Sequence, residues 1–468
     1  MVCPTATITN SPRNGTIPTG ATTLTNVPAN TNCIINFLIP NGYAMKLLIT
    51  DSDMNESDSI IVVDTVGKSH KIPMGATNYE TWFTSGSAFM NIKSQNDGTL
   101  MFYATYQFVP LKSFDKKQFY TGSYFSAQLA PNTVYTISTK TANEQVAVSV
   151  GKSSNGMVDP IAKMIYVYDG DNILNTTMIG RLTDLSTAKD RIYSSGASLS
   201  FVCFYNQSGV ESVSYILGND ASAVSSLITY SVLTMKQNSE ITRPFSEGSY
   251  LSACTFICID CTTFLVKNLT FDESIGYMEF HGLTPTHQME PLIRYDVSSF
   301  SSRQLPQIIP TRMFTMYIAM ATANIFSIST NSNSWLKPFD GRSGVITSPS
   351  LWDPSMRGGF QYTFRDENQL YSFNAQLSKI DFGASFWSDH LRLMIGFNDG
   401  NTTVNYNYPN TSISIKKGSG IGNFMSTVLF STSTQTDVRL TFSMKLYNSS
   451  SSYSVMISCL ATILLYFR

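Results

Sequence analysis

Ile165-Tyr166-Val167-Tyr168-Asp169-Gly170 is the stretch that decides the fold class of this chain. It places β-branched and aromatic residues, which favour strands, directly before an Asp-Gly pair, which favours a tight turn. Similar stretches are Ile60–Asp64, Leu292–Asp296 and Met394–Gly400, and their aspartates, with Asp169, follow one another at intervals of 105, 127 and 103 residues. Intervals of about a hundred residues correspond to whole small domains, so the pattern predicts hairpins at the centres of tandem domains.

The composition agrees with several β-rich units. The chain has 468 residues, more than one hydrophobic core usually supports. Only 13% of the residues are charged, so hydroxyls and amides supply most of the surface polarity. The formal net charge of -1 produces no long-range field for nucleic acid or for an anionic membrane, and we exclude both as partners on this ground.

Short apolar segments recur about every ten residues in the first quarter of the chain. They are residues 34–39, 44–49, 60–63, 88–92 and 101–106, separated by Gly, Pro, Asn and Ser. This spacing predicts an all-β protein built from antiparallel sandwiches. We place the modules at residues 1–112, 113–238, 239–332 and 333–447, with the third as a degenerate copy, followed by a Ser-rich segment and apolar tail at 448–468.

Two further matches support internal repetition. Ser195–Val202 parallels Ser85–Ile92, which places a Ser-Gly turn before a strand at the same stage of the first two modules. Gly248–Ala253 echoes Gly122–Ala127 at an offset of 126 residues, close to the hairpin offset of 127. This second match predicts that modules two and three share equivalent strands.

The two ends of the chain bear on its location. The first residues show neither a basic start nor an apolar run, so no secretory signal is visible. Residues 448–452 are small and residues 455–467 are apolar, a run too short to span a bilayer. This end resembles a lipid-anchor attachment signal, and a last strand with a frayed apolar end is the alternative.

The cysteines indicate an oxidising compartment. Of seven cysteines, six remain if the tail carrying Cys459 is removed, and an even number can pair completely. We expect one bridge between Cys3 and Cys33, and further bridges among Cys203, Cys254, Cys258 and Cys261, with all three connectivities open. Such pairing predicts a secreted or cell-surface protein whose signal peptide is missing from this sequence.

Glycosylation acceptors agree with an extracellular location but do not prove it by number. Asn-x-Ser/Thr occurs at Asn14, Asn55, Asn175, Asn206, Asn268, Asn401, Asn410 and Asn448. Several of these asparagines lie beside clusters of turn residues, where a bulky glycan could face solvent.

The sequence resembles a known group, the CUB-like domains abundant in nematode secreted proteins. Gly344-Val345-Ile346-Thr347-Ser348-Pro349 resembles the Gly-x-Ile-x-Ser-Pro opening of CUB modules. The strand with an acidic turn recurs in every module, and Ser94–Gly98 precedes the aromatic strand 102–106. The third module departs from the pattern, because Val297 stands where glycine is expected, and the paired cysteines of ordinary CUB modules are mostly missing.

The resemblance implies tandem jelly-roll-like sandwiches that bind an extracellular protein or glycan and catalyse nothing. For nematode members it implies a role in innate defence or stress at an epithelium. Some CUB modules bind calcium through loop carboxylates, and Asp53, Asp58 and Asp97 occupy loops that could correspond, although solvated loop acids are the alternative. No other cofactor is expected.

Two further residue patterns have both a functional and a structural interpretation. Cys254-x3-Cys258-x2-Cys261 matches the spacing of an iron-sulfur site, but its surroundings read as strands, and we favour disulfides over iron, zinc or redox cycling. Trp335, Trp352 and Trp387 all fall in the fourth module and could form a sugar-stacking platform, or could fill the core. A carbohydrate-binding protein is therefore the second functional class, and a glycosidase the third.

Overall fold

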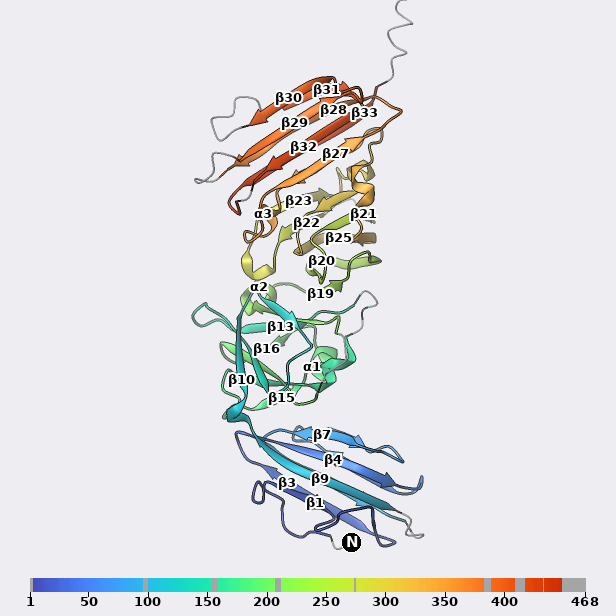
Figure 1. Cartoon of the computed structure of the whole chain (residues 1–468), viewed down its shortest axis with the longest axis vertical. Coiled ribbons are helices and arrows are strands. Elements are labelled where there is room, and N and C mark those ends of the chain that lie inside the picture. The colour runs from blue at the N-terminus through green and yellow to red at the C-terminus, as the bar shows by residue number, and fades with distance from the viewer. Residues whose placement is uncertain are drawn as a thin grey trace, which may run out of the picture. The chain divides into compact units, whose positions relative to one another are not determined.

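A computed structural model describes residues 3–95, 100–153, 156, 158–206, 212–272, 275–382, 389–408, 417–431 and 433–447. The chain divides by its internal contacts into two compact units (Figure 1). The first comprises Met1–Val150 with Val158–Ser222, and the second comprises Gly151–Met157 with Ala223–Arg468. The predicted tail at 448–468 lies outside the described residues.

Sheet pair A lies in the first unit and is drawn in blue in Figure 1. Its strands are β1 (Asn14–Ile17), β2 (Thr25–Asn26), β3 (Asn32–Ile39), β4 (Tyr43–Asp53), β5 (Ser59–Val63), β6 (Ser69–Lys71), β7 (Tyr79–Phe83), β8 (Gly86–Lys93) and β9 (Met101–Pro110). One sheet has the order β1-β9-β4-β7, with β2 beside β9, and the other has the order β3-β8-β5-β6. The 3-10 helix η1 (Leu111–Ser113) follows β9.

Sheet pair B completes the first unit. Its strands are β10 (Asp115–Tyr120), β11 (Tyr124–Ser126), β12 (Thr133–Ser138), β13 (Val146–Val150), β14 (Ile165–Asp169), β15 (Met178–Arg181), β16 (Ile192–Tyr193), β17 (Ser198–Cys203) and β18 (Tyr215–Asp220). Helices η2 (Pro160–Met164) and α1 (Leu182–Ala188) flank the β14–β15 hairpin. The sheets have the orders β11-β18-β13-β16 and β10-β12-β17-β14-β15, and β10 runs parallel to β12.

Strand group C opens the second unit after α2 (Ala221–Ser225) and forms one continuous sheet. It contains β19 (Tyr230–Met235), β20 (Glu240–Cys258), β21 (Phe264–Phe271), β22 (Tyr277–Gly282), η3 (Pro285–His287), β23 (Pro291–Asp296), η4 (Ser302–Gln304), β24 (Gln307–Ile309) and β25 (Met313–Ser329). The long strands β20 and β25 pair along nearly their whole length.

Sheet pair D ends the described chain. After η5 (Asn333–Leu336) come β26 (Ser343–Thr347), α3 (Pro349–Trp352), β27 (Phe360–Arg365), β28 (Tyr371–Asp381), β29 (His390–Gly396), β30 (Thr402–Tyr408), β31 (Lys417–Gly422), β32 (Phe424–Phe430) and β33 (Asp437–Leu446). Its sheets have the orders β26-β33-β28-β31 and β27-β32-β29-β30. Within the described ranges, no helix is both long and apolar enough to cross a membrane.

The same strand order recurs throughout. With strands numbered along each repeat and the added strands β2 and β10 set aside, A, B and D each place strands one, eight, three and six in one sheet. Strands two, seven, four and five form the other sheet. Group C keeps this order because the first half of β20 acts as strand one and its second half as strand two, while β25 supplies strands seven and eight. The predicted all-β, jelly-roll-like class is therefore confirmed, whereas the exact module boundaries remain predictions.

The predicted hairpins are correct in three places and wrong in one. β5, β14 and β29 each occupy strand four and pair with the strand that follows. Leu292–Asp296 instead forms β23, which is strand five, and strand four of C is β22. The pattern failed there because Asp296 also ends a strand at a turn, where its carbonyl accepts bonds from the amides of Ser299 and Phe300.

Of the two internal sequence matches, one joins equivalent strands and the other does not. Ser85–Ile92 and Ser195–Val202 include most of β8 and β17, which both occupy strand seven, so that match reflects equivalent positions. Gly122–Ala127 contains β11, which is strand one of B and pairs with β18. Leu251–Ala253 lies in the second half of β20, which acts as strand two, so the offset of 126 does not join equivalent strands.

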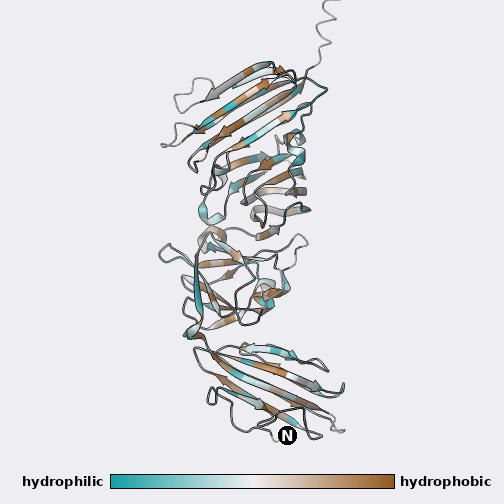
Figure 2. Cartoon of the chain, in the orientation of Figure 1, coloured by the Kyte–Doolittle hydropathy of each residue, from teal (hydrophilic) through white to brown (hydrophobic). Residues whose placement is uncertain are grey.

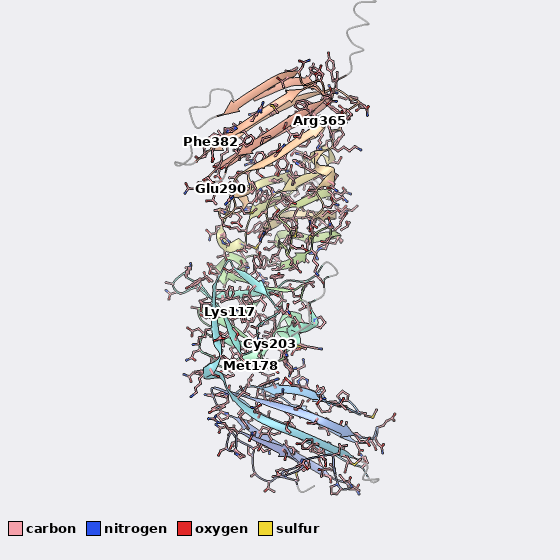
Figure 3. The ribbon with its side chains drawn as sticks, in the orientation of Figure 1. Lys117, Met178, Cys203, Glu290, Arg365 and Phe382 are labelled. Carbon is pink, nitrogen blue, oxygen red and sulfur yellow. A yellow bond between two sulfur atoms is a disulfide. The ribbon has the colours of Figure 1, made fainter. Side chains whose placement is uncertain are left out.

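Strand β14 is buried on both faces, and the two faces pack into different hydrophobic clusters. Ile165 and Val167 enter the core of sandwich B, while Tyr166 and Tyr168 enter a second cluster between A and B. This junction also contains Trp82 of β7 and Phe204, whose rings stack with centroids 5.1 Å apart. The outer face of the β12-β17-β14-β15 sheet is thus covered by residues of pair A, with Met178, labelled in Figure 3, among the contributors from B.

Polar groups fix the register of this junction. The hydroxyl of Tyr166 donates to the backbone carbonyl of Trp82 at 2.9 Å, and the guanidinium of Arg181 lies 5.4 Å from the Tyr166 ring centre. Burial raises the pKa of Tyr166 well above its ordinary value, so the hydroxyl keeps the proton that it donates. The Asp184 carboxylate forms an exposed ion pair with Lys68 across the same boundary.

Asp64, the counterpart of Asp169 in pair A, is a buried carboxylate at this boundary. Its Oδ1 accepts the amides of Val66 and Lys68, and its Oδ2 lies 3.2 Å from His70 Nε2 and 3.7 Å from Arg181. Burial acts to raise the pKa of Asp64, but the bonds from His70 and Lys68 and the charge of Arg181 outweigh it and hold the pKa below its ordinary value.

Replacing Tyr166 with Phe should destabilise the first unit, because the buried carbonyl of Trp82 loses its hydroxyl donor. The expected loss is about 1 to 3 kcal/mol in the free energy of unfolding. Calorimetric unfolding of the full chain measures it as a lower transition temperature of that unit. Tyr193→Phe, at an exposed position, is the matched control. Equal transition temperatures for Tyr166→Phe and wild type would contradict the junction.

The depressed pKa of Asp64 predicts a pH dependence. A carboxylate whose pKa is lower in the folded chain contributes stability above its unfolded pKa, and this contribution disappears as pH falls through the folded value. Asp64→Asn should therefore be less stable than wild type at pH 6, by about 1 to 3 kcal/mol. The difference should shrink steadily below pH 4. Unfolding of both proteins between pH 2 and 7 tests this, and a difference that does not change with pH would refute it.

Candidate functional site

The outer face of the β3-β8-β5-β6 sheet is unusual because apolar side chains are left open on it. β3 alternates strictly: Cys33, Ile35, Phe37 and Ile39 point into the sandwich core, so the residues between them point outward. These outward residues are Ile34, Asn36 and Leu38. Figure 2 shows hydrophobic and hydrophilic residues interleaved along the strands. The burial pattern of β3 shows that its outward positions include the hydrophobic residues Ile34 and Leu38.

The neighbouring strands extend this surface. On β8, Asn91 pairs opposite Ile34 and Phe89 opposite Asn36, and on β5, Ile61 and Val63 pair opposite Asn91 and Phe89. We call the resulting surface the A face, defined as Ile34, Asn36, Leu38, Ile61, Val63, Phe89 and Asn91. Ile34 is 49% exposed and Leu38 is 47% exposed, which leaves large apolar side chains in contact with water.

The A face is hollowed and carries no charged side chain among its defining residues. A hollow of about 550 Å³ is lined by Thr7, Asn36, Leu38, Val63, Ser87 and Phe89, together with the turn at residues 64–67. Lys71 and Lys93 lie at the ends of the neighbouring strands. None of the predicted glycosylation asparagines belongs to this face. Large apolar side chains left exposed on a sheet face, here interleaved with Asn36 and Asn91, are typical of a protein-interaction site.

The equivalent face in pair B shows what such a surface does in this fold. It belongs to strands two, seven, four and five, as the A face does, and it carries Val134, Val202, Tyr166 and Tyr168. There the opposite sheet of pair A covers it with Ala44, Trp82 and Val109. A sheet-on-sheet contact is therefore already made by this type of face within the chain.

A second, polar surface lies on pair D. We call it the D groove: a hollow of about 330 Å³ on the outer side of β28, β31 and β33, lined mainly by Asn374, Gln376, Lys417, Ser419, Thr441 and Ser443. A neighbouring hollow of about 280 Å³ shares Thr441 with it and continues over β26 to Arg294, Gln304 and Gln307 of group C. Both hollows lie within the second unit.

The described structure places two of the three predicted calcium ligands in different surroundings. Asp58 is buried and caps its own loop: its carboxylate accepts the amides of Asn55 at 3.1 Å and Gln95 at 3.0 Å. Asp53 is exposed at the end of β4, and Asp97 lies outside the described residues. In the part of the chain that is described, no three His, Cys, Asp or Glu side chains are grouped as metal ligands. The calcium site stays a prediction.

The cysteines pair only in part. Cys3 joins Cys33 with a Cα–Cα distance of 5.6 Å, and Cys258 joins Cys261 at 5.5 Å. The expectation that all six would pair is wrong for Cys203 and Cys254, which are buried thiols in the cores of different units (Cys203 is labelled in Figure 3). Burial raises the pKa of Cys254 to about 11. The Cys258–Cys261 bridge also removes two thiolates that an iron or zinc site would require.

The glycosylation positions are compatible with bulky glycans. Asn14, Asn55, Asn175, Asn206, Asn268 and Asn401 are all exposed, and Asn410 and Asn448 lie outside the described residues. Exposure is necessary for modification but does not establish it, so glycosylation remains a prediction.

Of the two interpretations of the tryptophans, filling the core is correct for two of the three, and these two do not form a platform. Trp335 is 1% exposed and Trp352 is 0% exposed. Trp335 packs against Phe364 and Phe442 in the core of D, and Trp352 enters the core of group C while its indole N–H donates to Thr347. Trp387 lies outside the described residues. Neither described indole can therefore stack on a sugar.

Sequence reasoning missed both the A face and the D groove. The apolar residues between positions 34 and 39, all but Asn36, were counted only as evidence for a strand, although alternating burial means that every second one must face outward. The signal for the A face was that Ile34 and Leu38 are apolar at positions where a half-buried strand would carry polar residues. The D groove carried no such signal, because Ser, Thr, Asn and Gln are common everywhere in this chain.

Comparisons with solved structures give distant matches. The chain is similar to the CUB1-EGF-CUB2 domain of human MASP-1/3, with 13% identity, a TM-score of 0.18, and coverage of 45% of this chain and 100% of that one. It is also similar to the CUB1-EGF-CUB2 domains of rat MASP-1, with 8% identity, a TM-score of 0.19, and coverage of 69% and 99%. The full extracellular region of zebrafish Gpr126/Adgrg6 matches with 9% identity, a TM-score of 0.19, and coverage of 96% and 53%.

A search of curated proteins finds no match to this chain. The model of one protein family does match, and its description is the CUB-like domain. The match spans residues 1–112, which include every strand of sheet pair A and therefore the whole A face. The part of the chain that carries the open apolar surface is thus the part that matches the CUB-like domain family.

Proposed function

We propose that this chain is a secreted or cell-surface protein that acts by binding and not by catalysis, and that its A face contacts a partner protein. The observation that carries the proposal is the exposure of Ile34 and Leu38 on one outward sheet face that also carries Phe89, Ile61 and Val63. Burying an Ile or Leu side chain fully is worth about 1.5 to 3 kcal/mol, so covering this face would supply a substantial part of a binding free energy.

The partner is a β-sandwich domain that presents an aromatic sheet face. The support is the junction within the first unit, where the equivalent face of B accepts Trp82 from the opposite sheet of A. The A face has the same strand order and a hollow beside Phe89 and Val63 that can take such a side chain. Because the residues that define the A face carry no charge, and Lys71 and Lys93 lie at its edge, shape and apolar contact would select the partner more than electrostatic steering would.

Several observations support an extracellular location. Residues 1–112 match the CUB-like domain family, two pairs of cysteines are bridged, and the described acceptor asparagines are exposed. Disulfides persist in oxidising compartments. We include in the proposal a signal peptide upstream, lipid anchoring through 448–468, and, from the resemblance to nematode CUB-like proteins, a role in defence at an epithelium.

The test is binding of the labelled full chain to intact epithelial cells of its natural source. Wild type should bind saturably, and Ile34→Asp/Leu38→Asp should bind about tenfold or more weakly, since a loss of 1.4 kcal/mol already corresponds to tenfold. Mild protease treatment of the cells should remove the binding, because the partner is a protein.

Ile275→Asp is the matched control, because Ile275 is 66% exposed and belongs to the second unit, whereas the A face belongs to the first. Circular dichroism and thermal unfolding confirm that all variants fold. Equal binding by wild type and the double variant would overturn the assignment of the A face. Analytical ultracentrifugation covers the remaining outcome. If wild type is a dimer and the double variant is a monomer, the A face binds a second copy of this chain, and the proposal of a different partner protein is overturned.

A further inference from the structure

The D groove crosses a whole sheet and presents a regular array of polar side chains. Opposite Asn374 on β28 stand Ser443 of β33 and Ser419 of β31, and opposite Gln376 stand Thr441 and Lys417. Ser343 and Val345 of β26 continue these rows beyond β33. Neighbouring strands lie about 4.8 Å apart, so four strands give a groove about 15 to 19 Å across.

The side chains of the groove are available to a ligand. Within the described residues, no hydrogen-bond partner holds the side chains of Asn374, Gln376, Ser419 or Ser443, and all four lie on the outward side of their strands. Amides both donate and accept, and hydroxyls do the same. This combination matches a ligand rich in hydroxyl groups that lies flat across the strands.

The charges in the groove have one sign. Lys417 lines the first hollow and Arg439 lines the second, and neither forms an ion pair with another described residue. Strand geometry places them about 12 Å apart on the same face. Arg294 at the far end is already paired with Glu279 at 2.6 Å and Asp296 at 2.8 Å. No Asp or Glu is among the described residues that line either hollow.

We propose that the D groove binds an acidic polysaccharide, in which sulfate or carboxylate groups meet Lys417 and Arg439 and sugar hydroxyls meet the amides and hydroxyls between them. Two cations without a local carboxylate partner select an anion, and charge-assisted hydrogen bonds are stronger than neutral ones. A protein partner would require apolar anchors at the centre of the contact, and among the described lining the outward side chains there are polar.

The proposal does not depend on the A face. The A face would bind protein through apolar contact in the first unit, whereas the D groove would bind anionic sugar in the second. A chain with both sites could connect a protein partner to an extracellular polysaccharide. Failure at one site leaves the other intact, so the two proposals are separable.

The experiment measures the affinity of the full chain for heparin and chondroitin sulfate by isothermal titration at 50 and 300 mM salt. Dextran is the neutral polysaccharide. Wild type should bind the two anionic chains, more weakly at high salt, and should not bind dextran. Lys417→Gln/Arg439→Gln should raise Kd about tenfold or more, while Lys116→Gln/Lys189→Gln, the same charge change at exposed positions, should leave Kd within twofold.

Asn374→Ala/Gln376→Ala separates sugar recognition from charge. It should weaken binding several-fold without changing the salt dependence, because it removes hydrogen bonds and no charge. Equal affinity of wild type and Lys417→Gln/Arg439→Gln for heparin overturns the proposal, as does absence of binding to either anionic chain. Binding to vesicles that contain phosphatidylserine is measured last. If wild type binds them as tightly as it binds heparin, and Lys417→Gln/Arg439→Gln weakens that binding, the site binds lipid and the proposal of a polysaccharide ligand is overturned.

Discussion

The two-sided character of each strand is the constraint on which this structure depends. In a sandwich, alternate side chains must enter the core, so the remaining side chains decide whether the outer face meets water or another sheet. β14 shows the covered case: Ile165 and Val167 fill the core of B, while Tyr166 and Tyr168 pack against Trp82 of A. The hydroxyl of Tyr166 then donates to the Trp82 carbonyl at 2.9 Å, which sets the register of the two sandwiches. β3 shows the open case, with Ile34 and Leu38 in water.

This division explains how two kinds of surface arise from one topology. The strand order is common to A, B and D and is recognisable in C, so the fold alone does not distinguish them. The outward residues do. On A they include exposed apolar side chains beside uncharged amides, and on B they are mostly aromatic or aliphatic and already covered. On the β26-β33-β28-β31 sheet of D, the outward residues that line the two hollows are mainly amides, hydroxyls, Lys417 and Arg439. In such an array the outer faces are available for binding, while the inner faces form the hydrophobic cores that stabilise the sandwiches.

Period-two patterns made the class and many strands predictable, and local turn chemistry made three of the four hairpins predictable. Leu292–Asp296 was misplaced because an aspartate at a strand end marks a turn without identifying which turn. The choice between a sugar platform and a core position for Trp335 and Trp352 stayed open at the sequence level because residue type does not reveal exposure: the same indole can stack on sugar or fill a core. Cys203 and Cys254 stay thiols because pairing depends on which core each enters, which no spacing reveals. The A face could not be predicted from the sequence, because its exposure depends on which sheets pack against a neighbour in the tertiary structure.

The central claim is that equivalent sheet faces are covered in B and open in A. Hydroxyl-radical footprinting of the free full chain, read by mass spectrometry, tests this most directly, because the label reaches only side chains in contact with water. The account predicts strong labelling of Ile34, Leu38 and Phe89 and protection of Trp82, Tyr166 and Tyr168. Labelled Trp82 and Tyr166 together with protected Ile34 and Leu38 would contradict it.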